Sequence, residues 1–322
     1  MSSQIEFMTF TRVLVLFFAA FSLSQTKAAM AQHMVVSPIP GKQTVAARAD
    51  RVPAARETRA KRDLWFPEDK DIDRAIPPVA EGVACPLDYV LTQAGERIVE
   101  LIHNVDKFTA TEIVRHQSVD RSGRLGRPKM HKFNYLVTMA QRPSGYVNVE
   151  EYRDGGSAPD QFPEHLATVG TPSLVLIFHP NNIKNFQMTC EGLGLWHGQA
   201  AWQVRFEERR ESRNRISVVE LADGSFGLRL RGRAWILDGS YQVARLESDL
   251  AEEIPKIRLH RQHQEIEYRP VPLPDAKGLI WLPATTELFM DFLGHRFYRQ
   301  HTFTDMKFFS VKVQQTFGEP KE

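Results

Sequence analysis

The chain has 322 residues, which is long enough to bury a sizeable core in one or two domains. Its formal net charge of +2 is too small to indicate a nucleic-acid-binding protein, so no nucleic-acid partner is expected. Apolar residues make up 42% of the chain and charged residues 25%, which is ordinary for a globular protein.

The N-terminus has the three-part layout of a secretory signal peptide. An apolar run, Val13 to Leu23, follows Arg12 and precedes the small-residue stretch Ala29-Met30-Ala31. We therefore predict that residues 1–31 are a signal peptide, cleaved before Gln32, and that the protein is periplasmic. About 11 apolar residues are too few to span the ~30 Å core of a bilayer, so no permanent transmembrane segment is expected after cleavage. An uncleaved membrane anchor is the alternative.

Residues 32–83 differ in composition from the rest of the chain. They contain six prolines and little apolar periodicity, and between Gln32 and Arg62 seven basic residues outnumber Asp50 and Glu57. Such a stretch cannot bury enough apolar surface to order itself, so it is predicted to be a disordered, basic linker. The alternative is a basic arm that touches anionic lipid or cell-wall polymer.

An amphipathic helix is predicted from Cys85-Pro86 to about Asn104, because apolar residues recur there at helical spacing. This apolar stripe consists of Leu87, Leu91, Ala94, Ile98, Leu101, Ile102 and Val105. The chain has two cysteines, Cys85 and Cys190. In an oxidising compartment they could pair and close a loop of about 100 residues, or they could be two buried free thiols.

Short alternating segments separated by turn residues follow the helix and predict an antiparallel meander rather than βαβ units. The strands are expected at 109–118, 133–139, 146–152, from 188, 202–207, 215–221, 264–268, 279–283, 285–292, 296–303 and 307–313. Asp154 to Pro163 is a polar loop and a candidate flap. Residues 171–186 are expected to form a helix interrupted around His179-Pro180.

Gly227 to Leu250 is predicted to be the central hairpin of the sheet. Leu228 and Leu230 alternate with arginines at 229, 231 and 233, which gives an extended strand one dry and one wet face. Asp238-Gly239 supplies residues that tolerate positive φ and therefore predicts the tight turn.

The stretch Gly232-Arg233-Ala234-Trp235-Ile236-Leu237-Asp238, followed by Tyr241 to Glu247, resembles a hairpin of the outer-membrane lipoprotein carrier and sorting superfamily, which includes LolA, LolB and RseB. Residues 268–271 and Trp281-Leu282-Pro283 are also similar to that family. The resemblance covers roughly residues 85–317. It implies an α+β fold in which a curved antiparallel sheet, a half-barrel, wraps over a few helices, and it implies a concave apolar face that holds acyl chains under a helical lid.

No catalytic or metal-binding constellation is recognised. His260 and His263 are spaced i, i+3 but have arginine neighbours, so they are predicted to be solvated surface residues rather than metal ligands. His295 and His301 are explained equally well by a polar sheet face. The adjacent pairs Glu150-Glu151 and Glu207-Glu208 point to opposite faces of their strands. We expect no enzymatic activity, no cofactor and no metal.

Aromatic side chains at alternating strand positions form the candidate ligand site. The residues predicted to line it are Phe133, Tyr135, Trp202, Phe206, Trp235, Phe289 and Phe303. One interpretation is a core filled by the protein's own side chains. The other is that part of this face lines a cavity for an acyl chain or another flat apolar ligand.

The sequence therefore predicts a signal peptide (1–31), a linker (32–83), one domain (84–317) and a short tail (318–322). The predicted function is a periplasmic carrier-like protein that holds a lipid or an acylated protein on the concave face of a half-barrel. The alternative is an interaction or sensor module, resembling RseB, that binds an envelope partner protein. The segments 154–163 and 171–186 are expected to act as the lid.

Overall fold

The computed structural model describes residues 65–143, 145–154, 167–212, 216–221, 224–273 and 278–309, and the backbone of β1 (His33–Val35). The predicted signal peptide, the tail and most of the predicted flap (155–163) lie outside the described residues. Within the described ranges, no helix is both long and apolar enough to cross a membrane.

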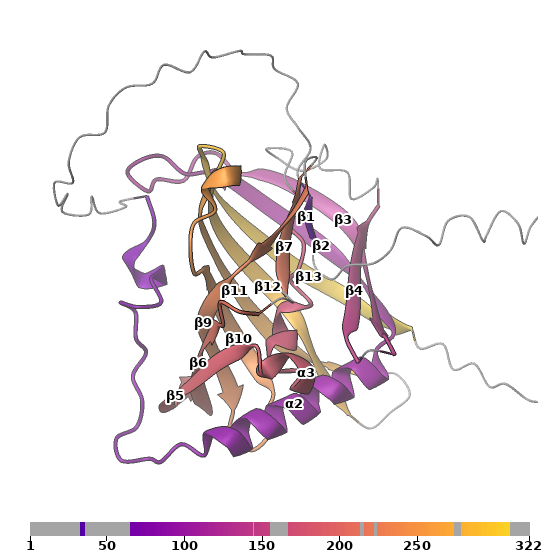
Figure 1. Cartoon of the computed structure of the whole chain (residues 1–322). Coiled ribbons are helices and arrows are strands. Elements are labelled where there is room, and N and C mark those ends of the chain that lie inside the picture. The colour runs from indigo at the N-terminus through magenta and orange to yellow at the C-terminus, as the bar shows by residue number, and fades with distance from the viewer. Residues whose placement is uncertain are drawn as a thin grey trace, which may run out of the picture. The chain divides into compact units, whose positions relative to one another are not determined.

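Ten antiparallel strands form one open sheet, in the order β4-β3-β2-β13-β12-β11-β10-β9-β6-β5 (Figure 1). The strands are β2 (Lys107–Ser118), β3 (Lys129–Gln141), β4 (Val147–Arg153), β5 (Phe186–Trp196), β6 (Gln199–Glu208), β9 (Leu230–Leu237), β10 (Val243–Leu250), β11 (Leu259–Pro272), β12 (Leu279–Phe292) and β13 (His295–Phe309). The open antiparallel sheet with few helices agrees with the predicted α+β class.

Two of these strands are longer than the sequence suggested. The segments predicted as 279–283 and 285–292 form the single strand β12, and the two predicted after residue 295 form β13. A register shift lies where the sequence predicted a gap between two strands. In β12 it is opposite Glu267 and Tyr268, and in β13 it is between Thr304 and Lys307. An extra residue bends a strand without ending it, which explains why the alternation in sequence is interrupted there.

The predicted hairpin is β9 and β10, joined through Asp238-Gly239, and Gly239 has a φ of 82°. Its expected start is wrong, because Gly227 and Leu228 end β8 (Gly224–Leu228) in a separate sheet. That small sheet contains β1, β7 (Ser217–Leu221) and β8, with β1 parallel to β7.

One face of the large sheet, here called the inner face, packs against α2 (Leu87–Asn104), the 3-10 helix η4 (Leu174–Phe178) and α3 (Pro180–Ile183). The predicted helix is confirmed as α2, and its buried positions include Val90, Ala94, Ile98 and Leu101. All five residues of η4 are buried. The predicted helix over 171–186 is present as two short pieces divided at Pro180, which begins α3.

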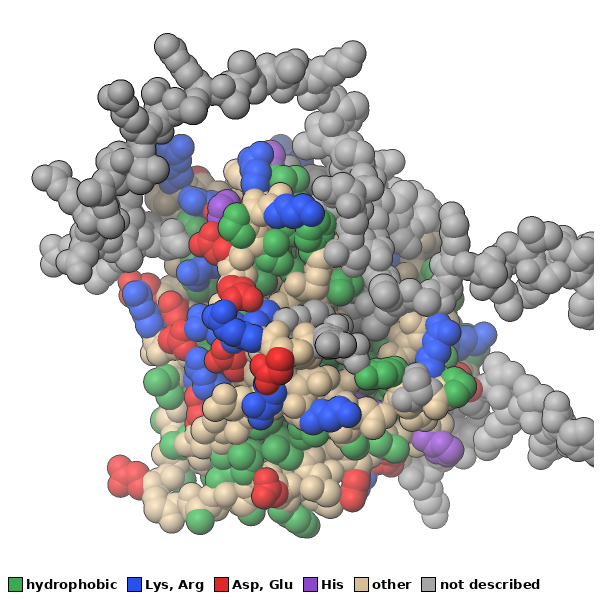
Figure 2. All heavy atoms as spheres, in the orientation of Figure 1, with side chains coloured by type: hydrophobic (Ala, Val, Ile, Leu, Met, Phe, Trp, Pro, Cys, Tyr) green, Lys and Arg blue, Asp and Glu red, His purple; other side chains and the backbone are tan. Residues whose placement is uncertain are grey.

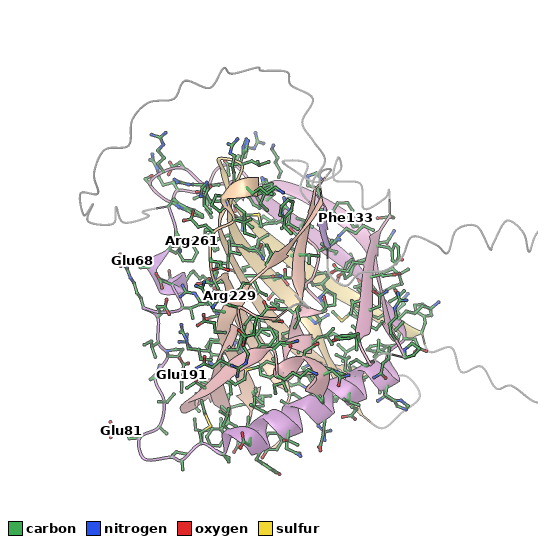
Figure 3. The ribbon with its side chains drawn as sticks, in the orientation of Figure 1. Glu68, Glu81, Phe133, Glu191, Arg229 and Arg261 are labelled. Atoms are coloured by element: carbon green, nitrogen blue, oxygen red, sulfur yellow. A yellow bond between two sulfur atoms is a disulfide. The ribbon has the colours of Figure 1, made fainter. Side chains whose placement is uncertain are left out.

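The opposite face, here called the outer face, is crossed by the strap, which we define as residues 65–84. Part of the predicted disordered linker is therefore ordered. Trp65, Phe66 and Ile72 are buried, and the strap contains the 3-10 helix η1 (Glu68–Lys70). The strap runs beside the sheet past Glu191 (Figure 3). A proline-rich segment cannot form a core of its own, but it can bury a few apolar side chains on a sheet that other residues have built.

Ion pairs join the strap to the outer face. The Lys70 ammonium lies 2.7 Å from a Glu265 carboxylate oxygen, and Asp73 lies 2.9 Å from Arg231. Arg233, predicted to be solvent-facing, is fully buried beneath the strap, where it pairs with Glu191 and donates to the Ile72 carbonyl oxygen at 3.1 Å. The wet face predicted from the arginine alternation is therefore wrong at Arg233, because the strap covers it. It is also wrong at Arg229, which is buried and donates to the Glu208 carbonyl oxygen.

A short 3-10 helix, η5 (Pro255–Ile257), leads into β11, where His263 corrects a second prediction. His263 is completely buried rather than solvated. Its Nδ1 lies 2.7 Å from Asp249 and its Nε2 lies 3.1 Å from Glu265, while the Phe66 ring of the strap covers it. The two carboxylates explain how a histidine among arginines is buried without being a metal ligand.

Candidate functional site

An apolar groove of about 760 Å³ lies between α2, the η4–α3 segment and the start of β5. Its walls are apolar side chains with a few polar groups at their margins. The apolar lining consists of Leu87, Leu91, Val99, Phe178, Pro180, Ile183, Phe186 and Met188. A volume of this size is typical of small-molecule binding sites.

The sequence of α2 creates one wall of this groove. Leu87, Leu91, Gly95 and Val99 are four residues apart and form a row along the flank of the buried stripe. A Cβ atom at position 95 would lie 3.2 Å from the Phe178 carbonyl oxygen, so glycine there lets η4 approach the helix closely. Val99, at the end of the row, is 46% exposed, which is a large apolar exposure for a helix residue.

Charged groups stand only at the margins of the groove. Asp88 and Glu96 on α2 and Lys184 after α3 belong to the lining, and each is exposed. The groove thus offers an apolar surface for a hydrocarbon, with an ammonium and two carboxylates where a polar head group would meet water.

A disulfide between Cys85 and Cys190 joins the start of α2 to β5, near this groove. The two Cα atoms are 6.4 Å apart, and the bond links residues separated by 105 positions. In the chain-entropy model, closing a loop of this length stabilises a fold by about 4.7 kcal/mol. The bond therefore fixes the helix that forms one wall against the strand that forms the other.

The inner face also carries a buried ionic cluster, centred on Glu112 of β2. One Arg153 nitrogen lies 2.8 Å from the Glu112 carboxylate, and the His301 Nδ1 lies 2.7 Å from the same oxygen. Burial alone would raise the pKa of Glu112, but Arg153 and His301 outweigh it and hold the pKa at about 2. Burial lowers the pKa of His301 despite the carboxylate beside it. This cluster is therefore an ion pair with a histidine that is neutral at physiological pH.

Two neighbouring side chains extend the cluster toward residues 167–173. The Tyr135 hydroxyl donates to Glu151 at 2.6 Å, and the backbone N–H of Gly170 donates to the other oxygen of Glu151. Burial raises the pKa of Glu151 and raises that of Tyr135 well above its ordinary value. On β13, Arg299 donates to the Thr168 hydroxyl at 2.6 Å.

These polar contacts anchor residues 167–173 and the edge strand β4 to the inner face. None of the cluster's side chains lines the apolar groove. Within the described ranges, no three His, Cys, Asp or Glu side chains are grouped closely enough to hold a metal ion. The contacts of the cluster therefore indicate a structural role, in which it holds residues 167–173 and β4 in place on the sheet.

The seven aromatic residues predicted to share one face lie in four separate clusters. Tyr135, Trp202, Phe206 and Phe303 belong to the main core on the inner face. Phe133 packs with Val114 and Ala167 in a cluster of its own.

Trp235 and Phe289 lie on the outer face, so the predicted common face is wrong for these two. Trp235 packs with Ala201 and Ala244, and Phe289 packs with Trp65 of the strap. Because the strap covers part of the outer face, aromatic residues are buried on both sides of the sheet, and alternation alone does not tell the sides apart.

None of the seven residues lines the apolar groove. Leu87 and Leu91 belong to the stripe predicted to face the core, and Val99 is not among the predicted site residues. The signal that could have found the groove is the four-residue row along α2, which ends in an exposed valine. The groove's other wall, Phe186 and Met188, has no comparable sequence signal.

No protein-family model and no curated protein sequence matches the chain. Among solved structures, it is similar to a DUF1329 family protein from Desulfovibrio piger (8% identity, TM-score 0.40), covering 72% of this chain and 96% of that one. It is also similar to a LolA superfamily protein from Nitrosomonas europaea (10% identity, TM-score 0.34), covering 71% of this chain and 96% of that one. A third similar structure is the lipoprotein LppX from Mycobacterium tuberculosis (8% identity, TM-score 0.24), covering 67% of this chain and 94% of that one. A member of the superfamily that the sequence resembles is thus among the solved structures to which this chain is similar.

Proposed function

We propose that this protein is an exported, periplasmic carrier-like protein that binds the acyl chain of a lipid or lipoprotein. The observation that carries the proposal is the apolar groove beside α2, with its volume of about 760 Å³. On this proposal the protein is a binding protein without enzymatic activity. The signal-like N-terminus and the Cys85–Cys190 disulfide support an oxidising compartment outside the cytosol.

The proposed ligand position differs from the one expected from the sequence. The inner face is filled by side chains of the sheet itself and by the buried residues of α2 and η4. An acyl chain therefore takes the groove along the flank of α2 rather than the space under the sheet.

The free energy of such binding comes from the hydrocarbon. Each buried methylene contributes about 0.8 kcal/mol, so about ten of them contribute roughly 8 kcal/mol before the entropic cost of association is subtracted. Short chains should bind weakly and long chains measurably, because polar groups are confined to the groove's margins. An affinity that rises with the length of the acyl chain would indicate binding in the apolar groove.

The test is a titration of the purified protein with a palmitoylated peptide and with its unacylated form, read by native mass spectrometry and fluorescence anisotropy. Val99→Glu puts a charge into the groove wall at a position where the helix tolerates glutamate. We expect saturable binding of the acylated peptide only, weakened at least about tenfold by Val99→Glu, since an acyl chain seated against position 99 would take the new carboxylate out of water, which costs more than about 1.4 kcal/mol.

Leu195→Glu is the matched control, because Leu195 is 69% exposed on β5 and lies outside the groove lining. It should bind the acylated peptide as the parent does. Equal affinities of all three proteins, or no binding of the acylated peptide, would contradict the proposal. Capture of an envelope protein that is unaffected by Val99→Glu would instead support the alternative, a partner-binding module.

A further inference from the structure

The hairpin between β2 and β3 concentrates positive charge at one end of the sheet. Between residues 115 and 132 there are six basic side chains and one acidic side chain, Asp120. The six are Arg115, Arg121, Arg124, Arg127, Lys129 and Lys132, here called the basic hairpin, and all are exposed. Lys and Arg side chains are visible at this upper end of the molecule (Figure 2).

Most of this charge is not neutralised within the fold. Asp120 accepts hydrogen bonds from Ser122 and from the Arg124 backbone, and it pairs with the Arg124 side chain at 3.2 Å. Across the described ranges, the salt bridges engage only Arg124 among the six basic side chains. Five cations therefore face solvent from one hairpin of a chain whose total formal charge is only +2.

The hairpin is an ordered platform for these charges. The Val119 N–H donates to the Arg296 carbonyl oxygen on β13 at 2.8 Å, and the Gly126 N–H donates to the Ser118 carbonyl oxygen at 2.8 Å. The Gln117 side chain donates to the Gly126 carbonyl oxygen at 2.8 Å. Because the turn is tied to the sheet, binding through it loses little conformational entropy.

Exposed apolar side chains lie among the cations. Leu125 is 45% exposed and Met130 is 58% exposed. The strand register pairs Arg115 with Met130, so these two side chains stand beside each other on the same face. The next pair on that face joins Lys132 with Ile113, which is 36% exposed. Cation and hydrocarbon therefore alternate over this face of the two strands, whereas Lys129 pairs with His116 and lies on the opposite face.

We propose that the basic hairpin docks the protein on a bilayer that contains anionic lipid. Cations spread along this face and the adjoining turn fit a surface of many negative charges better than one small anion in a pocket. Leu125 and Met130 would enter the boundary between head groups and acyl chains, which a soluble polyanion does not offer. This inference concerns an interaction surface and does not depend on a ligand in the groove.

The experiment is co-sedimentation of the full protein with vesicles of phosphatidylcholine alone or mixed with phosphatidylglycerol. The test variant is Arg121→Gln/Arg127→Gln/Lys132→Gln. Each Lys or Arg near an anionic surface contributes about fivefold to binding, so the triple variant should bind mixed vesicles roughly 100-fold more weakly than the parent. Thermal unfolding by circular dichroism verifies that the variant is folded.

The matched control is Lys107→Gln/Arg142→Gln/Lys307→Gln, which removes the same charge from the opposite ends of β2, β3 and β13. It should retain most of the vesicle binding. The basic stretch between residues 42 and 62 is present in every protein compared, so its contribution cancels. Equal loss of binding in the two triple variants would overturn the proposal, because net charge alone would then explain the interaction.

A second variant, Leu125→Ser/Met130→Ser, tests the apolar part of the surface at constant charge. We expect it to bind mixed vesicles several-fold more weakly than the parent, with the difference persisting at high salt, where charge is screened. If this variant binds as the parent does and soluble dextran sulfate displaces both proteins completely, the surface recognises an anionic polymer and the bilayer proposal is wrong.

Discussion

His263 is the side chain whose replacement tests the buried electrostatics of the outer face most directly. Its two ring nitrogens face Asp249 at 2.7 Å and Glu265 at 3.1 Å. A histidine can donate to two carboxylates at once only when both nitrogens carry a proton. The replacement His263→Gln keeps a polar side chain of similar size and removes the titration.

The magnitude follows from the pKa. Burial lowers the pKa of His263, but its hydrogen bonds to Asp249 and Glu265 outweigh this and raise it from 6.5 to about 9. A pKa raised in the folded state adds stability that is fully present below the unfolded value and is lost as the pH rises through the folded value. The free energy of unfolding should therefore fall by about 3 kcal/mol between pH 6 and pH 10 because of this one group.

The assay is urea unfolding of the parent and of His263→Gln at intervals from pH 6 to pH 10. Other groups titrate in this range, so the informative quantity is the difference between the two proteins at each pH. We expect the variant to be less stable at pH 6 and the gap to close by about 3 kcal/mol as the pH reaches 10. His260→Gln, at an exposed position on the same strand, is the control and should parallel the parent.

Two results would refute this reasoning. One is a parent and a His263→Gln variant whose unfolding free energies run parallel from pH 6 to pH 10. The other is a titration of the His263 ring, followed by NMR, with a pKa near 6.5 instead of about 9. Either would mean that the two carboxylates do not hold the imidazole in its charged form.

Three further predictions concern stability. Replacing Cys85 and Cys190 together with alanine should lower the free energy of unfolding, measured with urea, by about 2–5 kcal/mol. This is the usual cost of removing a native disulfide from a small domain. Glu112→Gln removes the carboxylate that Arg153 and His301 both contact and should lower stability by about 3–5 kcal/mol, with a fall in melting temperature. Trp65→Ala should loosen the strap, so that trypsin cleaves within residues 65–84 faster than in the parent.

Each of these predictions has a control or a contrary outcome. Reducing agent should lower the melting temperature of the parent and leave the cysteine-free variant unchanged. Glu253→Gln, which removes an exposed carboxylate, should stay close to the parent and provides the scale for Glu112→Gln. Identical trypsin cleavage of the parent and Trp65→Ala would show that the buried indole does not hold the strap.

Local patterns carried enough information to predict the main elements of the fold. The apolar stripe predicted a helix to about Asn104, where α2 ends, and Asp238-Gly239 predicted the β9–β10 turn. Alternation showed that the segments were strands but could not give their order. The pairing of β9 with β6 passes over β7 and β8, and only long-range packing decides such a connection.

The candidate site was harder to predict because its parts are distant in the sequence. Val99 and Met188 belong to a helix and a strand whose proximity no local pattern encodes. The outer face was mistaken for a solvated one, because the strap that buries Arg233 and His263 has a composition typical of linkers. The local alternation of polar and apolar residues predicts which side chains share a face of a strand. It does not show whether a segment elsewhere in the chain buries that face.

The position of β13 has a consequence for how the polypeptide matures. This strand lies between β2 and β12, and Phe297 pairs with Ser118, which lies about 180 positions earlier in the chain. A nascent chain that has not yet delivered residues 295–309 presents two inner strands with open backbone edges, which are sites of mispairing between molecules. Completion of the sheet must therefore await residues 295–309, so the sheet stays incomplete until that segment has been synthesised and has paired with β2 and β12.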